Sequence, residues 1–221
     1  KTSNPPTHPQ LLEELAKDFE KNGYSLKHLM RLIVQSRTYQ LSGVSNDTNR
    51  HDEVNYSHAL PRHLVAAVLM DAISQATGVP EQFENHQKTT EGAPPPGTRA
   101  LGLIPELYPC HFLDVYGRSM RKTLPLGKVS LTLAQGLHSW AGSTYTNKIT
   151  TVGGRLEQVL RDGLPDSSII EEFYLATLSR YPTKQEEKEL VAFISQGASR
   201  KDRLASLMWA LLNSREFSYN H

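Results

Sequence analysis

The stretch SLKHLMRLIVQSRTYQLS, residues 25–42, is the part of the chain from which the fold class is predicted most directly. Its apolar residues recur at the spacing of one helix face: Leu26, Leu29, Met30, Ile33 and Val34. Ser25 can cap this helix, because its hydroxyl can accept a free backbone N–H of the first turn. We therefore expect a core helix here, in which Leu29, Ile33 and Val34 are buried.

The same stretch carries an unusual number of polar side chains beside its apolar face, namely Arg31, Gln35, Arg37, Tyr39 and Gln40. An arginine at the edge of a buried stripe can pack its stem while its guanidinium finds partners. We therefore expect Arg31 and Arg37 to be held by acidic or carbonyl groups.

Helical periodicity extends over most of the remaining chain. Further apolar stripes run along residues 11–19, 64–73, 131–140, 156–160, 169–178, 190–194 and 204–212. Pro61 is expected to begin the helix of the second stripe, and Thr183 with Glu186 has the capping-box spacing. Short loops between the last helices favour antiparallel neighbours. The predicted fold class is mainly α, a multi-helix bundle with little or no β structure.

Residues 81–129 interrupt this pattern with an irregular central region. The tract EGAPPPGTRALG is rich in turn residues, and residues 100–104 and 112–116 are candidates for short strands. We predict a single α-helical domain over residues 1–221, with a subdivision into 1–80, 81–129 and 130–221. An irregular segment of this length in a compact domain is typical of a functional region, so a binding site is expected beside it.

Composition excludes several classes of protein. The chain has 24 basic and 23 acidic residues, which argues against a nucleic-acid-binding protein. Its one cysteine, Cys110, rules out a disulfide within the chain. No apolar run reaches the roughly 18 residues of a membrane span. Because the sequence opens with KTSNPPTHPQ and has no initiator methionine, we expect a fragment of a longer protein.

No metal, cofactor or catalytic motif is complete. The nine histidines lack the ligand spacing of zinc sites, and one cysteine cannot supply a haem attachment motif. We therefore expect no cofactor and no metal in this chain, and we assign no catalytic residue. Whether the protein is an enzyme stays open, with a non-catalytic role favoured.

Six residues form the candidate ligand site. The four arginines Arg31, Arg37, Arg62 and Arg118 can build an anion or carbohydrate pocket with two further residues, Tyr39 and Asp71. The alternative is that the same arginines make buried ion pairs that lock helices together, because structural networks also recruit arginine.

Successive blocks of the chain resemble one protein family. They are NPPTHPQLLEELAKDF, SLKHLMRLIVQSRTYQLS, PRHLVAAVLMDAISQATGVPE, FLDVYGRSMRKT, TLAQGLHSW, FYLATLSRYPTKQE and LMWALLNSREFSYNH. They are similar to the C-terminal domain of unknown function number 1553, common in planctomycete proteins that also carry a c-type cytochrome domain. The resemblance covers nearly the whole chain.

This resemblance implies a location and partners. The family's parent proteins are typically exported, so it implies an extracytoplasmic chain, in the periplasm or at the cell surface, with upstream domains as partners. Two functions follow as hypotheses. The first is a non-catalytic interaction or scaffold domain of a larger cytochrome-linked protein. The second is a polysaccharide-directed enzyme or glycan-binding domain with its site beside the irregular segment.

Overall fold

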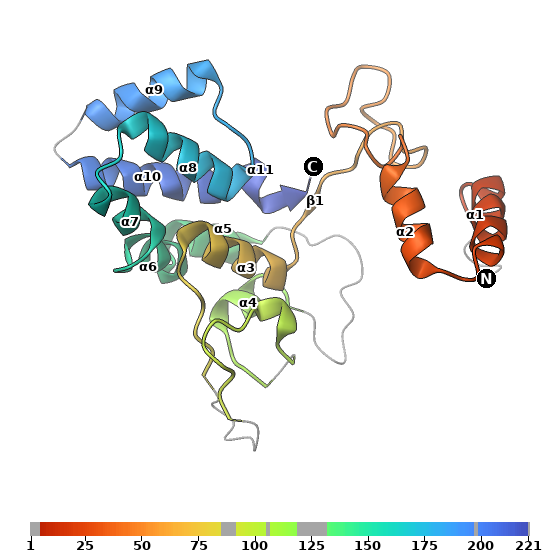
Figure 1. The fold of residues 1–221 in the computed structure, drawn as a ribbon, viewed down its shortest axis with the longest axis horizontal. Coiled ribbons are helices and arrows are strands. Elements are labelled where there is room, and N and C mark those ends of the chain that lie inside the picture. The colour runs from red at the N-terminus through yellow and green to blue at the C-terminus, as the bar shows by residue number, and fades with distance from the viewer. Residues whose placement is uncertain (1–4, 85–91, 105–106, 119–131, 197–198, 221) are drawn as a thin grey trace. The chain divides into compact units, whose positions relative to one another are not determined.

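The computed structural model describes residues 5–84, 92–104, 107–118, 132–196 and 199–220 (Figure 1). The chain divides into two compact units: unit 1 ends at Arg62, and unit 2 runs from His63 to Asn220. Helices are the main regular structure of both units, which confirms the predicted fold class. The only strands among the described residues are two short ones, β1 (Arg62–His63) and β2 (Tyr219–Asn220), which pair with each other. The boundary between the units falls upstream of the suggested subdivision at residue 80.

Unit 1 is built on two helices, α1 (Pro9–Lys21) and α2 (Leu26–Gln35). The predicted cap of α2 is confirmed, because the Ser25 hydroxyl accepts the backbone N–H of His28 at 3.3 Å. The imidazole of His28 in turn lies with its Nε2 2.8 Å from a carboxylate oxygen of Asp18, which links α2 to α1.

The prediction that the apolar stripe of α2 lies in a core is wrong. Ile33 and Val34 are 39% and 45% exposed, Leu29 is only half-buried, and neither helix contains a buried residue. A pair of short helices encloses too little volume to bury an apolar face. The periodicity therefore predicted the helix correctly but not the burial of its apolar side chains. Arg31 and Arg37 are also exposed, and the partners expected for them are not found among the described residues.

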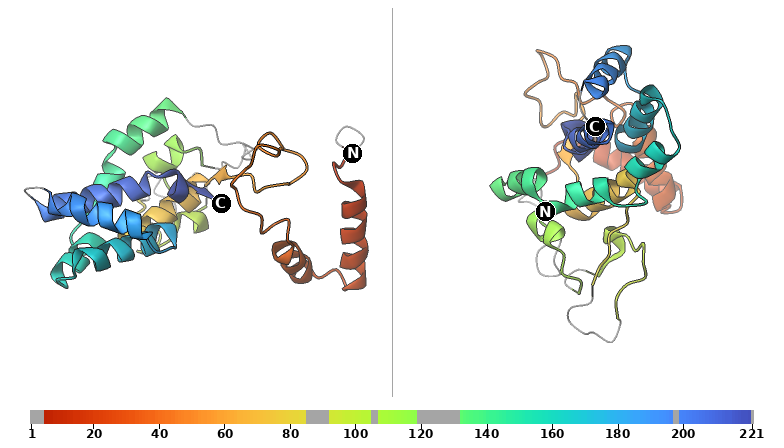
Figure 2. Two further views of the ribbon diagram at one scale, coloured as in Figure 1. Left: turned by 90° about the horizontal axis from the view of Figure 1, so that it is seen from above. Right: turned by 90° about the vertical axis from the view of Figure 1, so that its left-hand side faces the viewer.

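Unit 2 contains the remaining elements. After β1 they are α3 (Ala66–Thr77), the 3-10 turn η1 (Ala100–Gly102), α4 (His111–Val115), α5 (Leu133–Ala141), α6 (Ser143–Thr150), α7 (Arg155–Arg161), α8 (Asp166–Leu178), α9 (Lys184–Ser195), α10 (Arg200–Leu212), α11 (Arg215–Ser218) and β2. The helices α8, α9 and α10 pack side by side, as both views show (Figures 1 and 2), and α3 packs against α8.

The core of unit 2 lies where α3, α8 and α10 meet. Ile73 of α3, Ile169, Ile170 and Phe173 of α8, and Leu204 of α10 are all completely buried. The predicted stripes of α8 and α10 are therefore correct, in contrast to the stripe of α2, and in the stripe predicted for α3 Leu69 and Ile73 are buried while Val65 is 44% exposed. The same amphipathic pattern produces a core here because several helices supply facing apolar surfaces.

Two local predictions in unit 2 are corrected by the structure. The candidate strands at residues 100–104 and 112–116 are instead the 3-10 turn η1 and the helix α4. The helix expected from Pro61 starts only at Ala66. The preceding backbone stays extended because it is engaged elsewhere: the Leu64 amide donates to the Ser218 carbonyl at 2.9 Å, beside the β1–β2 pair.

The capping box at the start of α9 is confirmed and extended by an arginine. The Thr183 hydroxyl accepts the Glu186 amide, and the Glu186 carboxylate accepts the Thr183 amide at 2.7 Å. Arg180 then donates to both oxygens of Glu186 and to both oxygens of Glu216 at 2.6–3.0 Å. These hydrogen bonds, chiefly those from Arg180, lower the pKa of Glu186 to about 2.

We expect this network to make unit 2 sensitive to acid. A carboxylate with a lowered pKa contributes stability above its ordinary pKa, here 4.5, and loses it as the pH falls toward 2. Thermal unfolding followed between pH 7 and pH 2 should therefore show a smaller loss of stability for Glu186→Gln than for the unmodified protein. Glu189→Gln, an exposed position of the same helix, is the matched control. Identical pH profiles for all three proteins would contradict the prediction.

Candidate functional site

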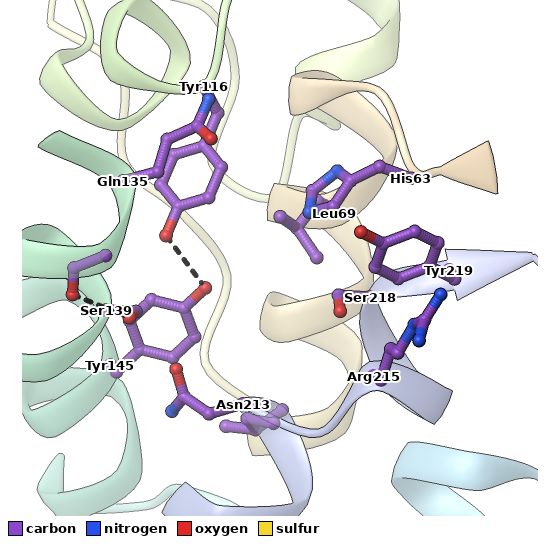
Figure 3. A pocket seen from close by; sticks show the side chains of 12 residues that line it. His63, Leu69, Tyr116, Gln135, Ser139, Tyr145, Asn213, Arg215, Ser218 and Tyr219 are labelled. Carbon is purple, nitrogen blue, oxygen red and sulfur yellow. Dashed lines mark hydrogen bonds between the residues drawn. The ribbon is translucent and has the colours of Figure 1, made fainter. Parts of the chain in front are cut away.

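A cavity of about 420 Å³ opens in unit 2, and we take it as the candidate site (Figure 3). Its size falls within the usual range of small-molecule pockets. The described residues that line it come from seven elements and the turns between them: His63, Leu69, Tyr116, Gln135, Gly136, Ser139, Tyr145, Leu212, Asn213, Arg215, Ser218 and Tyr219. We call it the unit 2 pocket.

Two tyrosines form one wall of the unit 2 pocket. The hydroxyls of Tyr116 and Tyr145 lie 3.3 Å apart and point toward each other in Figure 3. Phe112 stacks on Tyr116 with ring centroids 4.3 Å apart, which fixes the plane of that ring. Burial raises the pKa of both phenols, so both keep their protons at neutral pH.

The first turns of α5 continue this wall. Thr132 and Gln135 form a capping box. The side-chain Nε2 of Gln135 also donates to the Val115 carbonyl at 3.2 Å, which links α5 to the end of α4. One turn further, the Ser139 hydroxyl donates to the Gly136 carbonyl at 2.9 Å. That bond uses the only proton of the hydroxyl, so its oxygen can still accept a hydrogen bond from a ligand.

The opposite wall consists of β1, β2 and α11. The rings of His63 and Tyr219 meet edge to face with centroids 5.2 Å apart, and the Arg215 guanidinium lies 5.2 Å from the centre of the Tyr219 ring. The Nδ1 of His63 lies 2.8 Å from the Leu64 carbonyl oxygen. Because a carbonyl can only accept, Nδ1 carries the proton, and Nε2 is the nitrogen left for another partner.

The floor of the pocket is apolar with one amide. Leu69 of α3 and Leu212 of α10 are each 1% exposed. Asn213, directly after α10, donates to the Trp209 carbonyl at 2.8 Å, which leaves its side-chain oxygen as an acceptor. The pocket therefore combines a dry floor with polar groups on two walls.

His138 lies behind the tyrosine wall. It is 9% exposed and makes edge-on ring contacts with Phe112 and Tyr116. Its Nε2 lies 3.3 Å from the Thr144 hydroxyl, and its Nδ1 has no hydrogen-bond partner among the described residues. Burial, reinforced by the nearby His111, lowers its pKa, so this imidazole is neutral at pH 7.

Four of the six residues predicted from the sequence to bind a ligand lie in unit 1. Arg31 is on α2, Arg37 and Tyr39 follow it, and all three side chains are exposed. Arg62 is exposed at the end of the unit. None of the four lines the unit 2 pocket.

The other two predicted residues, Asp71 and Arg118, lie in unit 2 and have structural partners. The Asp71 carboxylate accepts the backbone amides of Ala100 and Leu101 at 2.7 and 3.1 Å, which anchors η1 to α3. The Nε of Arg118 lies 2.8 Å from the carboxylate of Asp114, and its Nη1 donates to the Tyr108 carbonyl at 2.8 Å. The contacts of Arg118 are of the kind that the alternative describes, in which an arginine locks elements together.

Sequence reasoning missed the residues of the unit 2 pocket. Of the described lining residues only Tyr116 belongs to the irregular region 81–129, beside which a site was expected. The aromatic pair Phe112 and Tyr116, four residues apart, was the one local signal of a helix with an aromatic face. Nothing local marks His63 and Arg215 as neighbours, because β1 and α11 are about 150 residues apart in the chain and meet only through the β1–β2 pairing.

Neither a metal-binding cluster nor a membrane-crossing helix is present in the described part of the chain. No group of three or more histidine, cysteine, aspartate or glutamate side chains has the arrangement of a metal site there. Over the same residues no helix combines the length and the apolar character needed to cross a bilayer.

Comparison with known proteins identifies the lineage of the chain. No match was found among curated proteins or among solved structures. The model of one family matches residues 1–194, which cover all helices through α8 and nearly all of α9. The chain therefore belongs to the family described as PSD1, protein of unknown function (DUF1553).

Proposed function

We propose that this domain is a non-catalytic interaction module whose α1–α2 pair packs against another domain of a longer protein. The observation that carries the proposal is the exposed apolar face of unit 1. Five large apolar side chains of α2 are between 39% and 63% exposed: Leu26, Met30, Leu32, Ile33 and Val34. An amphipathic helix is stabilised when its apolar face is buried against another surface, so this exposed face is suited to packing against a partner.

The charges on α2 indicate the chemistry of the partner. At 100° per residue, Lys27 and Arg31 follow directly on the Val34 side of the apolar stripe. The helix contains no acidic residue, and neither cation has an acidic partner among the described residues. A complementary surface is therefore an apolar groove with carboxylates along one edge.

The family resemblance supplies the setting of this proposal. We propose that the parent protein is exported, that it acts outside the cytoplasm, and that the partner is an upstream domain, with a c-type cytochrome domain as one candidate. The competing idea is a polysaccharide-directed enzyme. Glycoside hydrolysis usually needs a pair of carboxylates, and the described lining of the unit 2 pocket contains none, which favours the non-catalytic role.

Site-specific photo-crosslinking in the longer natural protein tests the proposal. A photoreactive side chain in place of Met30, which is 63% exposed in the apolar stripe, should crosslink to the polypeptide upstream of this domain. The same group in place of Gln35, about 140° around the helix by the same geometry, is the matched control and should give little crosslink. Mass spectrometry of the crosslinked peptides identifies the partner.

Charge reversal tests the acidic edge of the groove. Arg31→Glu should lower the yield of the Met30 crosslink several-fold, because it places like charges together at the interface. Crosslinks from Met30 that lead only to lipid or to a second copy, or equal yields from positions 30 and 35, would overturn the proposal.

A further inference from the structure

We infer that the unit 2 pocket binds a small hydroxylated organic acid of about the size of a monosaccharide. This goes beyond the proposed interaction role and is independent of it, since it concerns different residues in a different unit. The inference comes from three properties of the pocket: its charge, its hydrogen-bonding groups and its volume.

The charge of the pocket selects an anion. Arg215 is exposed at the wall of the cavity, and within the described part of the chain its guanidinium contacts the face of the Tyr219 ring and no acidic side chain. No aspartate or glutamate is among the described residues that line the cavity. Arg215 is paired with no carboxylate among the described residues, so its guanidinium can form paired hydrogen bonds with the carboxylate of a ligand. His63 faces the same space in Figure 3, and because its Nδ1 is hydrogen-bonded to the Leu64 carbonyl, its Nε2 can accept a hydrogen bond from a ligand hydroxyl.

The other polar groups fit the hydroxyls of such a ligand. Two phenolic protons are present on Tyr116 and Tyr145, but the hydrogen bond between these hydroxyls uses only one, so the second remains for a ligand oxygen. Ser139 and Asn213 each donate a hydrogen bond to a backbone carbonyl, and each keeps a side-chain oxygen that can accept a hydrogen bond. With the second N–H of the Asn213 amide, these groups offer two donors and two acceptors around a central space, a set that matches several neighbouring hydroxyl groups.

The size and floor of the pocket limit the ligand. A volume of about 420 Å³ exceeds what a bare anion would fill, so the pocket has room for a carbon skeleton beside the anionic group. The buried side chains of Leu69 and Leu212 and the ring faces of the tyrosines can contact the C–H groups of that skeleton. A six-carbon hydroxy acid satisfies the charge, the hydroxyl pattern and the volume together.

Isothermal titration calorimetry of the intact chain tests the inference with three acids, D-glucuronate, D-galacturonate and D-gluconate. At least one should bind, and it should bind at least tenfold more tightly than neutral D-glucose and than inorganic phosphate. Arg215→Gln should weaken that binding about tenfold or more, the scale expected for losing charge-assisted hydrogen bonds. Because Arg215 is exposed, this variant should fold normally, which circular dichroism verifies.

Arg203→Gln is the matched control. Its guanidinium also lies over an aromatic ring, 4.7 Å from the centre of Phe193, but it does not line the pocket, so acid binding should be unchanged. Tyr145→Phe, which removes one of the two hydroxyls, should weaken binding several-fold. The inference is overturned if none of the three acids binds, if glucose or phosphate binds as tightly as they do, or if the two arginine variants behave alike.

Discussion

Phe173→Ala is expected to lower the free energy of unfolding of unit 2 by about 3–5 kcal/mol. The side chain of Phe173 is completely buried. It lies at the centre of α8, which packs against both α3 and α10. Alanine would remove the apolar contacts of the ring and leave a cavity among residues that cannot close around it. Urea unfolding followed by tryptophan fluorescence measures the change, because Trp140 and Trp209 both belong to unit 2.

Leu175→Ala provides the comparison within the same helix. Leu175 is 39% exposed, so its truncation should cost no more than half as much as that of Phe173. Equal costs at the two positions would mean that α8 is not packed as the structure has it.

Gly142→Ala is expected to destabilise unit 2 by about 2–4 kcal/mol through a steric clash. Gly142 lies between α5 and α6, and its amide donates to the His138 carbonyl at 2.8 Å. A Cβ at this position would lie well inside van der Waals contact with that carbonyl oxygen and 2.9 Å from Cδ2 of the His138 ring. Since His138 is 9% exposed and packed against Phe112 and Tyr116, it cannot move aside without disturbing the tyrosine wall.

Gly136, six residues earlier, is the matched glycine, and its replacement by alanine should increase the stability of unit 2 rather than decrease it. Gly136 is inside α5 and a Cβ there would meet no atom within 4 Å. Gly136→Ala should therefore stabilise the helix by about 0.5–1 kcal/mol, because alanine loses less backbone entropy. The same urea experiment gives both values. A destabilising Gly136→Ala or a neutral Gly142→Ala would contradict the described junction of α5 and α6.

Features that depend on a few neighbouring residues could be predicted from the sequence. The Ser25 cap, the capping box of Thr183 and Glu186, and the apolar stripes of α8 and α10 are all present. Hydrogen bonds within one turn and side chains on one helix face involve residues at most a few positions apart, so the local sequence is sufficient. The same reasoning predicted the mainly α class.

The burial of a stripe could not be predicted, because it depends on what lies opposite. The stripes of α2 and α8 follow the same rule of spacing, yet Ile33 is 39% exposed and Phe173 is fully buried. The difference lies in the neighbours: α8 packs against α3, α9 and α10, whereas α2 has a single helical neighbour within unit 1, α1. Amphipathic spacing predicts that a helix has an apolar face, but it does not predict which other element packs against that face.

The sequence by itself determined that this chain is helical, where most of its helices lie and to which family it belongs. Only the tertiary structure decided which helices form a core, that Asp71 and Arg118 anchor neighbouring segments, and that His63, Tyr145 and Arg215 line one pocket. The physical reason is the distance along the chain between the residues that interact. Helix formation and capping are set within one or two turns, whereas a pocket requires side chains from distant segments to converge, which happens only after the core has brought those segments together.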